Sequence, residues 1–537
     1  MEIPRVGVPG ALADRLSMAE QHEFLSRRSM LKGAAAGGAL LAAGPLLLPG
    51  AAYATGDRVA PAGRHLAFGR NPRTTMRIAW QVPAPVRNPF VRVAEAGERP
   101  GRWSHRIPAE LRTLHSEVAG VIAPRDQYYV HAEVGGLRPG HGYRYIAGHD
   151  GYDPVGEPGH PFRTAPARGF PAEAFTFTAF GDQGVTTHAL AVDGAVARQK
   201  PAFHLLAGDI AYADPNGAGL PIGGTPDSAH DTFDPGVWDA YFGQIEPLAA
   251  SVPWMVTTGN HDMEALYSPD GYGGQLARWD FPGSGPAGCP SAYSFIYGNV
   301  GVVSLDANDV SNEIPANRGY TGGGQTAWLK RRLRYLRLQP DVDFVVVFFH
   351  HCAYSTTRAH ASDGGVRDEW VPLFDRYHVD LVINGHNHVY ERSDALRAGR
   401  VTRAVRIGDT VHPDRDGTVY ATCGGGGKSL YDFPAPDTYA GHEGPHVDVP
   451  SYYWAPGKGK VTETVAWSRV RYTGYAFLAI DARPAFPGRD TTLTVRTLSG
   501  DGAEIDRFAL RRTAGFHRGF DPSSLSVTGL GADPGDA

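Results

Sequence analysis

The segment VDLVINGHNHVYER, Val379 to Arg392, decides the fold class, because an apolar run leads directly into a glycine and two histidines. The run predicts a strand buried on both faces, as in a sheet covered by helices. His386 and His388 stand two residues apart behind Gly385. A single histidine pair in a loop is more often hydrogen-bonded or solvated than metal-bound. The pair therefore predicts a metal site only if ligand residues also end other strands.

Four other apolar runs end in a side chain that can bind metal. They are Phe175–Phe180 before Asp182, Ala202–Ala207 before Asp209, Trp254–Thr258 before Asn260, and Asp343–Phe349 before His350. In α/β sheets, binding sites form at the carboxyl ends of strands. The five runs therefore predict one shared site at one edge of the sheet region.

The motifs at these strand ends supply an unusual number of ligands. Tyr212 follows Asp209 by three residues in GDIAY, and His261 follows Asn260 in GNHD. Together the motifs offer two carboxylates, one phenol, one amide oxygen and three imidazoles besides His261. This set is too large for one ion and suits two ions that share one carboxylate. In each motif a glycine or a turn lets the backbone bend sharply beside the ligand.

Length and composition limit the classes of protein. The chain has 537 residues, 42% of them hydrophobic and 20% charged, which predicts two or three globular domains. The net charge of -5 excludes a nucleic-acid footprint, and the basic run Lys330–Arg337 predicts the solvated face of an amphipathic helix. The three cysteines lack CxxC spacing and allow at most one disulfide.

The N-terminal segment predicts an export signal. SRRSMLK, at 26–32, precedes a weakly apolar run, Gly33–Pro49, and then AAYA at 51–54. This pattern resembles a twin-arginine signal over residues 1–54, cleaved after Ala54. A membrane anchor is the alternative, disfavoured because the run is short and broken by proline. We expect the twin-arginine export machinery as partner, a secreted or cell-envelope location, and no stable membrane span after cleavage.

Beyond the predicted signal, the pattern of apolar and polar residues divides the chain into two predicted domains and a tail. Residues 60–166 predict an all-β domain, in which Thr74–Val82 alternates as in a half-buried strand. Tyr143 follows a Leu-x-Pro-Gly turn, as in the tyrosine corner of a β-sandwich, and the region resembles a fibronectin type III domain. Residues 172–512 predict the catalytic domain, with 392–512 as its C-terminal part. Residues 513–537 predict a loose tail.

The ordered set GDxG, GDxxY, GNHD, a strand-terminal His and GHxHxYER resembles the purple acid phosphatases, within the calcineurin-like metallophosphoesterases. The resemblance implies a four-layer α/β (α+β) sandwich of two central sheets flanked by helices, after a fibronectin-like sandwich. It implies an Fe(III) ion held by Asp182, Asp209, Tyr212 and His388. It also implies a second divalent ion (Zn, Fe(II) or Mn) bridged by Asp209 and held by Asn260, His350 and His386.

The resemblance also implies roles for other histidines. His261 would contact the phosphate or protonate the leaving group, and His360 would be a further substrate histidine. Either His350 or His351 could be the ligand in the fourth motif. We favour His350, which adjoins the strand and keeps the spacing to Tyr354. Cys352, beside this motif, is expected to be a buried small residue.

The implied function is a secreted acid phosphatase that hydrolyses phosphate monoesters with a hydroxide held by two metal ions. One alternative is a phosphodiesterase or phospholipase D activity, as in enzymes resembling alkaline phosphatase D. A remote alternative is a non-catalytic phosphate- or surface-binding protein. TCGGGGKS, Thr422–Ser429, imitates a phosphate-binding P-loop but lacks its first glycine. We expect it to be a flexible loop near the rim of the site.

Overall fold

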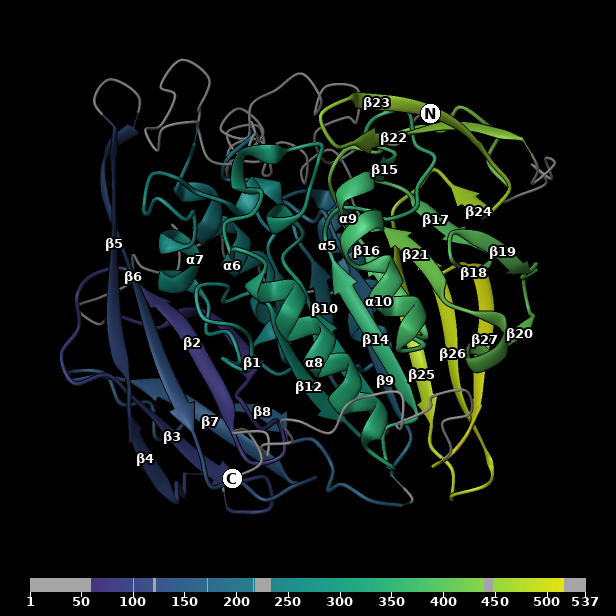
Figure 1. Ribbon diagram of the computed structural model, residues 1–537. Coiled ribbons are helices and arrows are strands. Elements are labelled where there is room, and N and C mark those ends of the chain that lie inside the picture. The colour runs from purple at the N-terminus through teal and green to yellow at the C-terminus, as the bar shows by residue number, and fades with distance from the viewer. Residues whose placement is uncertain are drawn as a thin grey trace, which may run out of the picture.

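The computed structural model describes residues 59–99, 101–118, 122–170, 172–215, 217, 233–438 and 448–515 of the chain. The predicted export signal, 1–54, and all but the first three residues of the predicted tail, 513–537, lie outside this part. Figure 1 shows a β-sandwich (purple to blue) beside a larger body of two sheets with helices. In the described part, no helix is both long and apolar enough to cross a membrane.

The N-terminal part is a sandwich of two four-stranded antiparallel sheets. The first sheet contains, in spatial order, β1 (Ala62–Phe68), β2 (Met76–Val82), β6 (Ile122–Val134) and β5 (Glu110–Val118). The second contains β4 (His105–Pro108), β3 (Phe90–Glu95), β7 (Gly142–Gly148) and β8 (His160–Arg163). The predicted tyrosine corner is confirmed, because the Tyr143 hydroxyl accepts a hydrogen bond from the Arg138 amide at 2.8 Å.

Strand β2 differs from its prediction. We expected one buried face, yet Gln81 on the other face is also buried. The cause is helix α6 (Gly236–Ala249), which covers this face and accepts a hydrogen bond from Gln81 through Asp239 at 2.7 Å. The alternation of apolar and polar residues along one strand cannot predict that a helix distant in the sequence buries its second face.

Two seven-stranded sheets form the centre of the larger part. The first has, in order, β11 (Trp254–Thr257), β10 (His204–Ala207), β9 (Phe175–Phe180), β25 (Ala476–Arg483), β26 (Asp490–Ser499), β27 (Glu504–Thr513) and β20 (Thr410–Val411). The second has β12 (Tyr293–Tyr297), β13 (Val300–Ser304), β14 (Phe344–Phe349), β16 (Leu381–Asn384), β21 (Val419–Cys423), β17 (Tyr390–Ser393) and β24 (Ser468–Tyr472). Smaller sheets join β15 (Ser362–Asp363), β22 (Val449–Ala455) and β23 (Gly459–Val465), and β18 (Ala395–Arg397) with β19 (Arg400–Arg403).

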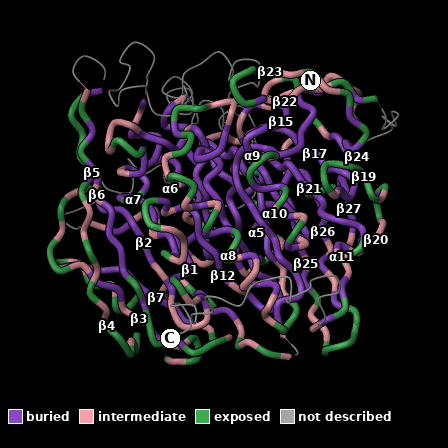
Figure 2. Tube along the Cα trace, viewed as in Figure 1, coloured by how far each residue is buried: buried purple, intermediate pink, exposed green. Residues whose placement is uncertain are grey.

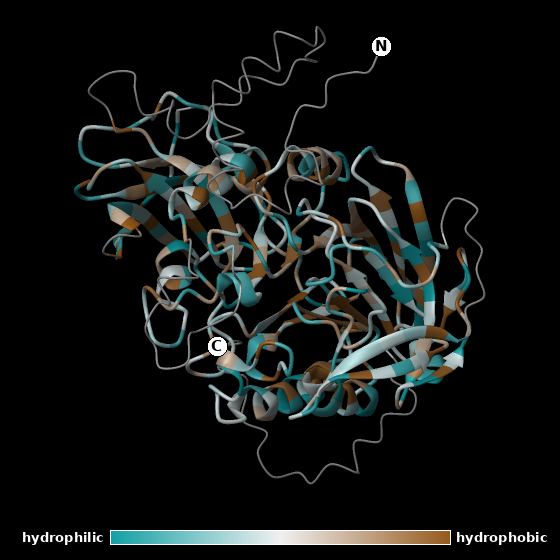
Figure 3. Cartoon of the chain, turned by 90° about the horizontal axis from the view of Figure 1, so that it is seen from above, coloured by the Kyte–Doolittle hydropathy of each residue, from teal (hydrophilic) through white to brown (hydrophobic). Residues whose placement is uncertain are grey.

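Helices cover the outer faces of both sheets. The helices of the described part are α5 (Thr187–Arg198), α6, α7 (Gly273–Arg278), α8 (Gly324–Leu338), α9 (Gly364–Glu369), α10 (Val371–Arg376) and α11 (Pro413–Asp416), with short 3₁₀ turns η1 (Asn260–Asp262), η2 (Ala307–Asp309) and η3 (Pro315–Asn317). In Figure 1, α8, α9 and α10 lie in front of the second sheet, and Figure 3 shows a row of helices along the lower edge from above. The predicted four-layer arrangement is confirmed.

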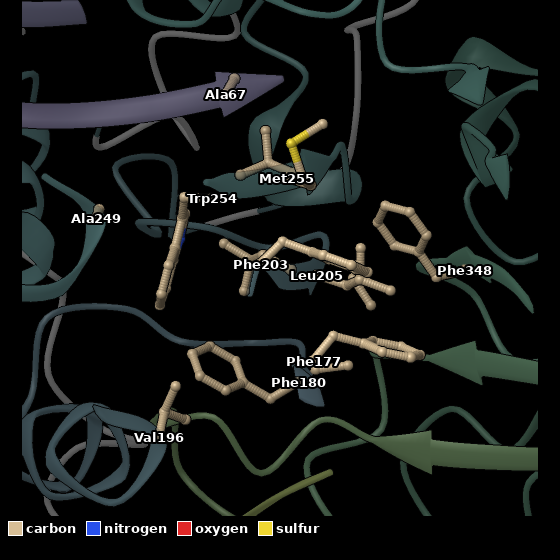
Figure 4. Close-up of a cluster of buried hydrophobic side chains, with 14 of the residues drawn as sticks. Ala67, Phe177, Phe180, Val196, Phe203, Leu205, Ala249, Trp254, Met255 and Phe348 are labelled. Atoms are coloured by element: carbon tan, nitrogen blue, oxygen red, sulfur yellow. The ribbon is translucent and has the colours of Figure 1, made fainter. Parts of the chain in front are cut away.

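The packing follows from the sequence patterns. The predicted apolar face of α8 is buried, including Trp328, Leu329, Leu333 and Leu336, and packs in one cluster with the outward residues of β14. Every residue of β14 and of β16 is buried, as continuous apolar runs predict. Figure 2 shows this buried interior inside an exposed rim of loops. Figure 4 shows Phe348 of the second sheet in the same buried cluster as Phe177 and Leu205 of the first, so one hydrophobic core lies between both sheets.

The tripeptide Tyr390–Arg392, which follows the histidine pair, connects the two sheets through hydrogen bonds. Tyr390 donates a hydrogen bond at 2.7 Å to Asp506 of β27, and Arg392 donates to the same carboxylate at 2.5 Å. Glu391 points the other way and accepts hydrogen bonds from the hydroxyls of Ser355 and Thr356, at 2.8 and 2.6 Å. Alternation along β17 thus lets one tripeptide hold both the facing sheet and the loop after β14.

Candidate metal centre

The structure brings together the seven residues predicted to bind metal. Parallel strands β9, β10 and β11 end at the same edge of the first sheet, and parallel β14 and β16 end opposite them in the second. All seven side chains are buried, with at most 4% of any residue exposed: Asp182, Asp209, Tyr212, Asn260, His350, His386 and His388. So many polar groups away from water need partners or cations.

Four of these residues have strained backbones. Asp182, Asp209, Tyr212 and His386 adopt φ values of 60°, 51°, 57° and 67°. Each such conformation costs a non-glycine residue about 1–3 kcal/mol and persists only where the surroundings impose it. Such strain gathers at functional sites, and here it turns each side chain inward.

The glycines beside these residues are required by close packing. A Cβ on Gly385 would lie 2.6 Å from Asp182 Oδ2 and 2.5 Å from the Ala207 carbonyl oxygen. A Cβ on Gly424, in the TCGGGGKS stretch, would lie 2.7 Å from Asp182 Oδ2. The expectation that this stretch forms a loop near the site is confirmed beyond Cys423, but its position at the rim is wrong, because Gly424 to Gly427 are buried under the ligand loops.

We name Asp182, Tyr212 and His388 the tyrosine cluster. The Tyr212 hydroxyl lies 3.1 Å from Asp182 Oδ1 and 2.9 Å from His388 Nε2. The third side of the triangle, from His388 Nε2 to Asp182 Oδ1, is 3.3 Å. Two hard oxygens and one imidazole therefore surround a single point.

We name Asn260, His350 and His386 the histidine cluster. His350 Nε2 lies 3.1 Å from Asn260 Oδ1 and 3.1 Å from His386 Nδ1. Asp209 Oδ2 lies 3.2 Å from the same His350 nitrogen. His350, not its neighbour His351, therefore faces the other ligands. Asp209, His350 and His386 present their ligand atoms within 4.8 Å of one another, close enough to hold an ion.

These spacings match ligands around a metal ion. Ligands about 2.1 Å from an ion stand about 3.0 Å apart in octahedral and about 3.4 Å apart in tetrahedral geometry. The distances between ligand atoms are 2.9–3.3 Å in the tyrosine cluster and 3.1–3.2 Å in the histidine cluster. The donor set of carboxylate, phenol, amide and imidazole suits transition-metal ions. The residues present thus fit two cations.

Hydrogen bonds at the outer ring nitrogens orient the imidazoles. His350 Nδ1 pairs with the Ala207 carbonyl oxygen at 2.8 Å, and His388 Nδ1 with the Ser429 carbonyl oxygen at 2.6 Å. A carbonyl can only accept, so each Nδ1 carries the proton and each Nε2 lone pair faces its cluster. Metal-binding histidines in proteins are held in this way.

The carboxylates of Asp182 and Asp209 dominate the electrostatics of the two clusters. Burial, with the carboxylates of Asp182 and Asp209, raises the pKa of the Tyr212 phenol well above its usual value. Burial opposes protonation of His350, yet Asp209 and Asp182 outweigh it and raise the pKa of His350 to about 9. The clusters attract positive charge, which bound cations would supply in place of protons.

The two predicted substrate histidines lie on different sides of the centre. The His261 amide donates to Asp209 Oδ1 at 3.0 Å, and its ring lies 4.5 Å from the Tyr212 ring, with 17% of the side chain exposed. The His360 ring lies 4.2 Å from the His386 ring and pairs through Nδ1 with Glu313 at 2.6 Å. The structure therefore places both beside the clusters.

Sequence reasoning missed Glu313 and Tyr431. Glu313 also pairs with His386 at 2.9 Å, and the Tyr431 ring stacks on His388 at 4.0 Å. Neither stands in a motif; only the position of Tyr431 shortly after the glycine stretch could have suggested it. The three cysteines are all free and buried, and Cys352 donates to the Gly385 carbonyl oxygen at 3.0 Å.

Comparison with known proteins agrees with this geometry. Family models match as "Calcineurin-like phosphoesterase" over residues 184–390 and "Purple acid Phosphatase, N-terminal domain" over residues 61–164. An uncharacterized protein of Mycobacterium tuberculosis is 33% identical, covering 90% of this chain and 93% of its own length. Purple acid phosphatase 18 of Arabidopsis thaliana is 27% identical, with coverage of 67% and 72%.

Two solved structures share the fold. The purple acid phosphatase PPD1 of yellow lupin has a TM-score of 0.63 at 19% identity, covering 85% of this chain and 75% of its own. PhoD has a TM-score of 0.51 at 14% identity, covering 86% and 92%. Identities this low report the fold alone.

The fold and the ligand clusters define a calcineurin-like metallophosphoesterase, a hydrolase of phosphate esters. Within this class the N-terminal sandwich and the relatives agree on one branch. The chain belongs to the purple acid phosphatase family. Enzymes of this family typically use two metal ions.

Proposed function

We propose that the protein is a secreted acid phosphatase that hydrolyses phosphate monoesters at a centre of two metal ions. The observation that carries the proposal is the pair of buried ligand clusters on either side of Asp209. Asp209 contacts His350 directly and contributes to the raised pKa of Tyr212, so its charge acts on both clusters. A shared carboxylate would hold two ions close together, as two-metal phosphoryl chemistry needs.

The clusters differ in ligand chemistry, which supports two different ions. The tyrosine cluster, with Asp209, would hold Fe(III), because carboxylate and phenolate oxygens are hard donors. The histidine cluster, with Asp209, would hold Zn, Fe(II) or Mn. When bound, the two ions supply positive charge that neutralises phosphate oxygens and lowers the pKa of water.

His261 is placed to assist departure of the leaving group. Its Nδ1 lies 2.6 Å from the Asp214 carbonyl oxygen, so Nδ1 carries a proton and Nε2 remains to face the substrate. A protonated Nε2 would donate to the departing alkoxide oxygen, the work of a general acid. His360 would contact the substrate from beyond the histidine cluster.

Residues 26–54 support export by the twin-arginine route. This pathway carries folded proteins, so the ions could be loaded before export. Reporter fusions with Arg27 and Arg28 changed to lysine should remain inside the cell, whereas fusions to the unchanged leader should be exported. Export of both would contradict this part of the proposal.

Hydrolysis of p-nitrophenyl phosphate and of bis(p-nitrophenyl) phosphate tests the substrate class. We expect purified protein with two metal equivalents to prefer the monoester by at least about tenfold in kcat/KM, at mildly acid pH. An Asp209→Asn variant purified in parallel controls for contaminating phosphatases. Preference for the diester would instead favour a PhoD-like activity, and two bound ions without turnover on either ester would favour a binding protein.

A further inference from the structure

Glu313 lies beside the candidate centre but belongs to none of the motifs. It stands in the loop between η2 and η3, and its side chain is 9% exposed. Both carboxylate oxygens are occupied: Oε1 by His360 Nδ1 at 2.6 Å and Oε2 by His386 Nε2 at 2.9 Å. One carboxylate therefore joins a predicted metal ligand to a predicted substrate histidine.

The contact with His386 fixes which ring nitrogen faces the metal site. A carboxylate accepts, so the proton of a neutral His386 ring lies on Nε2 and the lone pair on Nδ1. Nδ1 is the nitrogen that lies 3.1 Å from His350 Nε2 in the histidine cluster. A carboxylate–histidine–metal arrangement orients a ligand and increases its basicity.

The backbone around Glu313 holds the carboxylate in place. The Glu313 amide donates to Asp363 Oδ2 at 3.1 Å, and the same oxygen accepts from the Ser311 hydroxyl at 2.8 Å. On the other side, the Trp454 indole donates to the His360 carbonyl oxygen at 3.0 Å. Glu313 is therefore fixed between two supported loops.

We propose that Glu313 is a positioning residue that holds His386 on the second metal ion and couples it to His360. The inference rests on the proposed two-metal function and assigns to Glu313 a part in it. Loss of the carboxylate would leave the His386 ring free to rotate or change tautomer, so the second ion would be held less tightly. The first ion, held by the tyrosine cluster, would be affected much less.

A third ion between Glu313, His360 and His386 is the competing interpretation, because their ligand atoms lie within 4.8 Å. The shorter of the two Glu313 distances argues against it. The Glu313–His360 pair, at 2.6 Å, is shorter than the spacing of ligands around an ion, and both this pair and the Glu313–His386 pair at 2.9 Å have the lengths of charge-assisted hydrogen bonds. Direct hydrogen bonds therefore explain the contacts.

Metal binding by a Glu313→Gln variant of the full exported chain tests the proposal. Glutamine preserves the size but can accept from only one of the two histidines. Zinc is titrated into iron-loaded protein against a competing chelator, while absorption of the ferric tyrosinate reports the other cluster. We expect zinc affinity to fall about 10–100-fold with the iron absorption retained.

Two further variants make the result specific. Glu463→Gln removes a comparable carboxylate, paired with Arg367 at 2.7 Å away from the clusters, and should leave zinc affinity unchanged. Glu313→Asp keeps the charge but is too short to reach both histidines, so it should weaken zinc less than glutamine does. It also serves as the test if Glu313→Gln does not fold.

The outcomes separate this inference from the proposed function. If the unchanged protein binds two ions and Glu313→Gln binds zinc equally tightly, the positioning role is wrong while the function stands. If the unchanged protein binds three equivalents and Glu313→Gln two, a third site replaces the positioning role. If the unchanged protein binds no metal, the two-metal function fails, and this inference fails with it.

Discussion

Strand β16 has a buried polar cluster at each end, and the two clusters are neutralised differently. At its start, Asp380 is fully buried between Arg337 of α8 and Arg512 of β27, with Arg512 Nε 2.5 Å from the carboxylate. Beyond its end lie the candidate ligands. Within the described residues, Asp182 and Asp209 form ion pairs with histidines and with no arginine or lysine.

The way each cluster is neutralised distinguishes a structural ion-pair cluster from a candidate ion-binding site. Two guanidinium groups neutralise Asp380 and also donate to backbone carbonyl oxygens, among them those of Tyr377 and His378. That cluster is complete without a ligand. Within the described residues, the cluster at the carboxyl end offers converging carboxylates and imidazole lone pairs, and no arginine or lysine forms an ion pair with its carboxylates, although the Lys428 ammonium lies 4.7 Å from the Tyr212 ring. A buried charge that the protein leaves unbalanced therefore marks the place where it binds ions.

The largest effect should follow from Asp209→Asn, which removes the carboxylate that serves both ligand clusters. We expect kcat/KM for p-nitrophenyl phosphate to fall by at least about 10⁴-fold, about 5.5 kcal/mol, with loss of metal measured by elemental analysis.

Asp193→Asn is the matched control for this variant. Burial raises the pKa of Asp193 well above its usual value, and its Oδ1 accepts a hydrogen bond from Gln183 Nε2 at 2.8 Å, away from the ligand clusters. We expect activity and metal content to stay within about twofold of the unchanged enzyme. Equal activity of Asp209→Asn and Asp193→Asn would remove the distinction between the two ends of β16.

A substitution at the opposite end of β16 should lower the free energy of unfolding instead of the activity. Asp380→Asn leaves two buried guanidinium groups without their shared carboxylate, which costs about 3–5 kcal/mol of unfolding free energy. The folded fraction should keep both metal ions and its kcat/KM. Asp153→Asn is the control, since its pair with Arg92 is partly exposed and contributes less than about 1 kcal/mol. Urea unfolding measures both.

The contribution of Asp380 should persist in acid. Burial opposes ionisation, but Arg337 and Arg512 outweigh it and lower the pKa of Asp380 below its usual value. A lowered folded-state pKa adds stability above the unfolded-state pKa, about 3.9, and this stability is lost as pH falls through the folded value. The stability difference between the parent and Asp380→Asn should be constant from about pH 7 to 5 and shrink only below about pH 4. A decline already near pH 6 would contradict this pairing.

A smaller loss of activity should follow from a substitution of His261, which lies beside the candidate metal ligands. His261→Ala should lower kcat for esters with poor leaving groups by about 10²-fold, about 2.7 kcal/mol, because the general acid is lost. Metal content should be unchanged, since no predicted ligand is removed. Activated esters, whose leaving groups need no proton, should be affected less. Loss of metal in this variant would reassign His261 to the ligand set.

The sequence predicted which side chains the structure brings together better than it predicted the residues that support them. Each of the seven candidate ligands follows a buried strand, and most stand near a glycine, two local signals that a motif contains. The partner of Arg392, by contrast, is Asp506, 114 residues away on the facing sheet. Glu313 reaches His386 from a loop without any periodic pattern, 73 residues earlier. Local patterns cannot specify such long-range contacts, because the contacts depend on how the two sheets pack.

The smallest effect on rate should come from Tyr212→Phe, yet it tests the assignment of the tyrosine cluster most directly. A phenolate bound to Fe(III) gives a violet charge-transfer absorption, which phenylalanine cannot support. We expect the colour to vanish while iron is retained through Asp182, His388 and Asp209, and kcat to change by less than about tenfold, 1.4 kcal/mol. If the unchanged enzyme is colourless, free of iron and active, the cluster holds a different ion. The two-metal centre would survive that result, because the unbalanced charge beyond β16 calls for cations without specifying their identity.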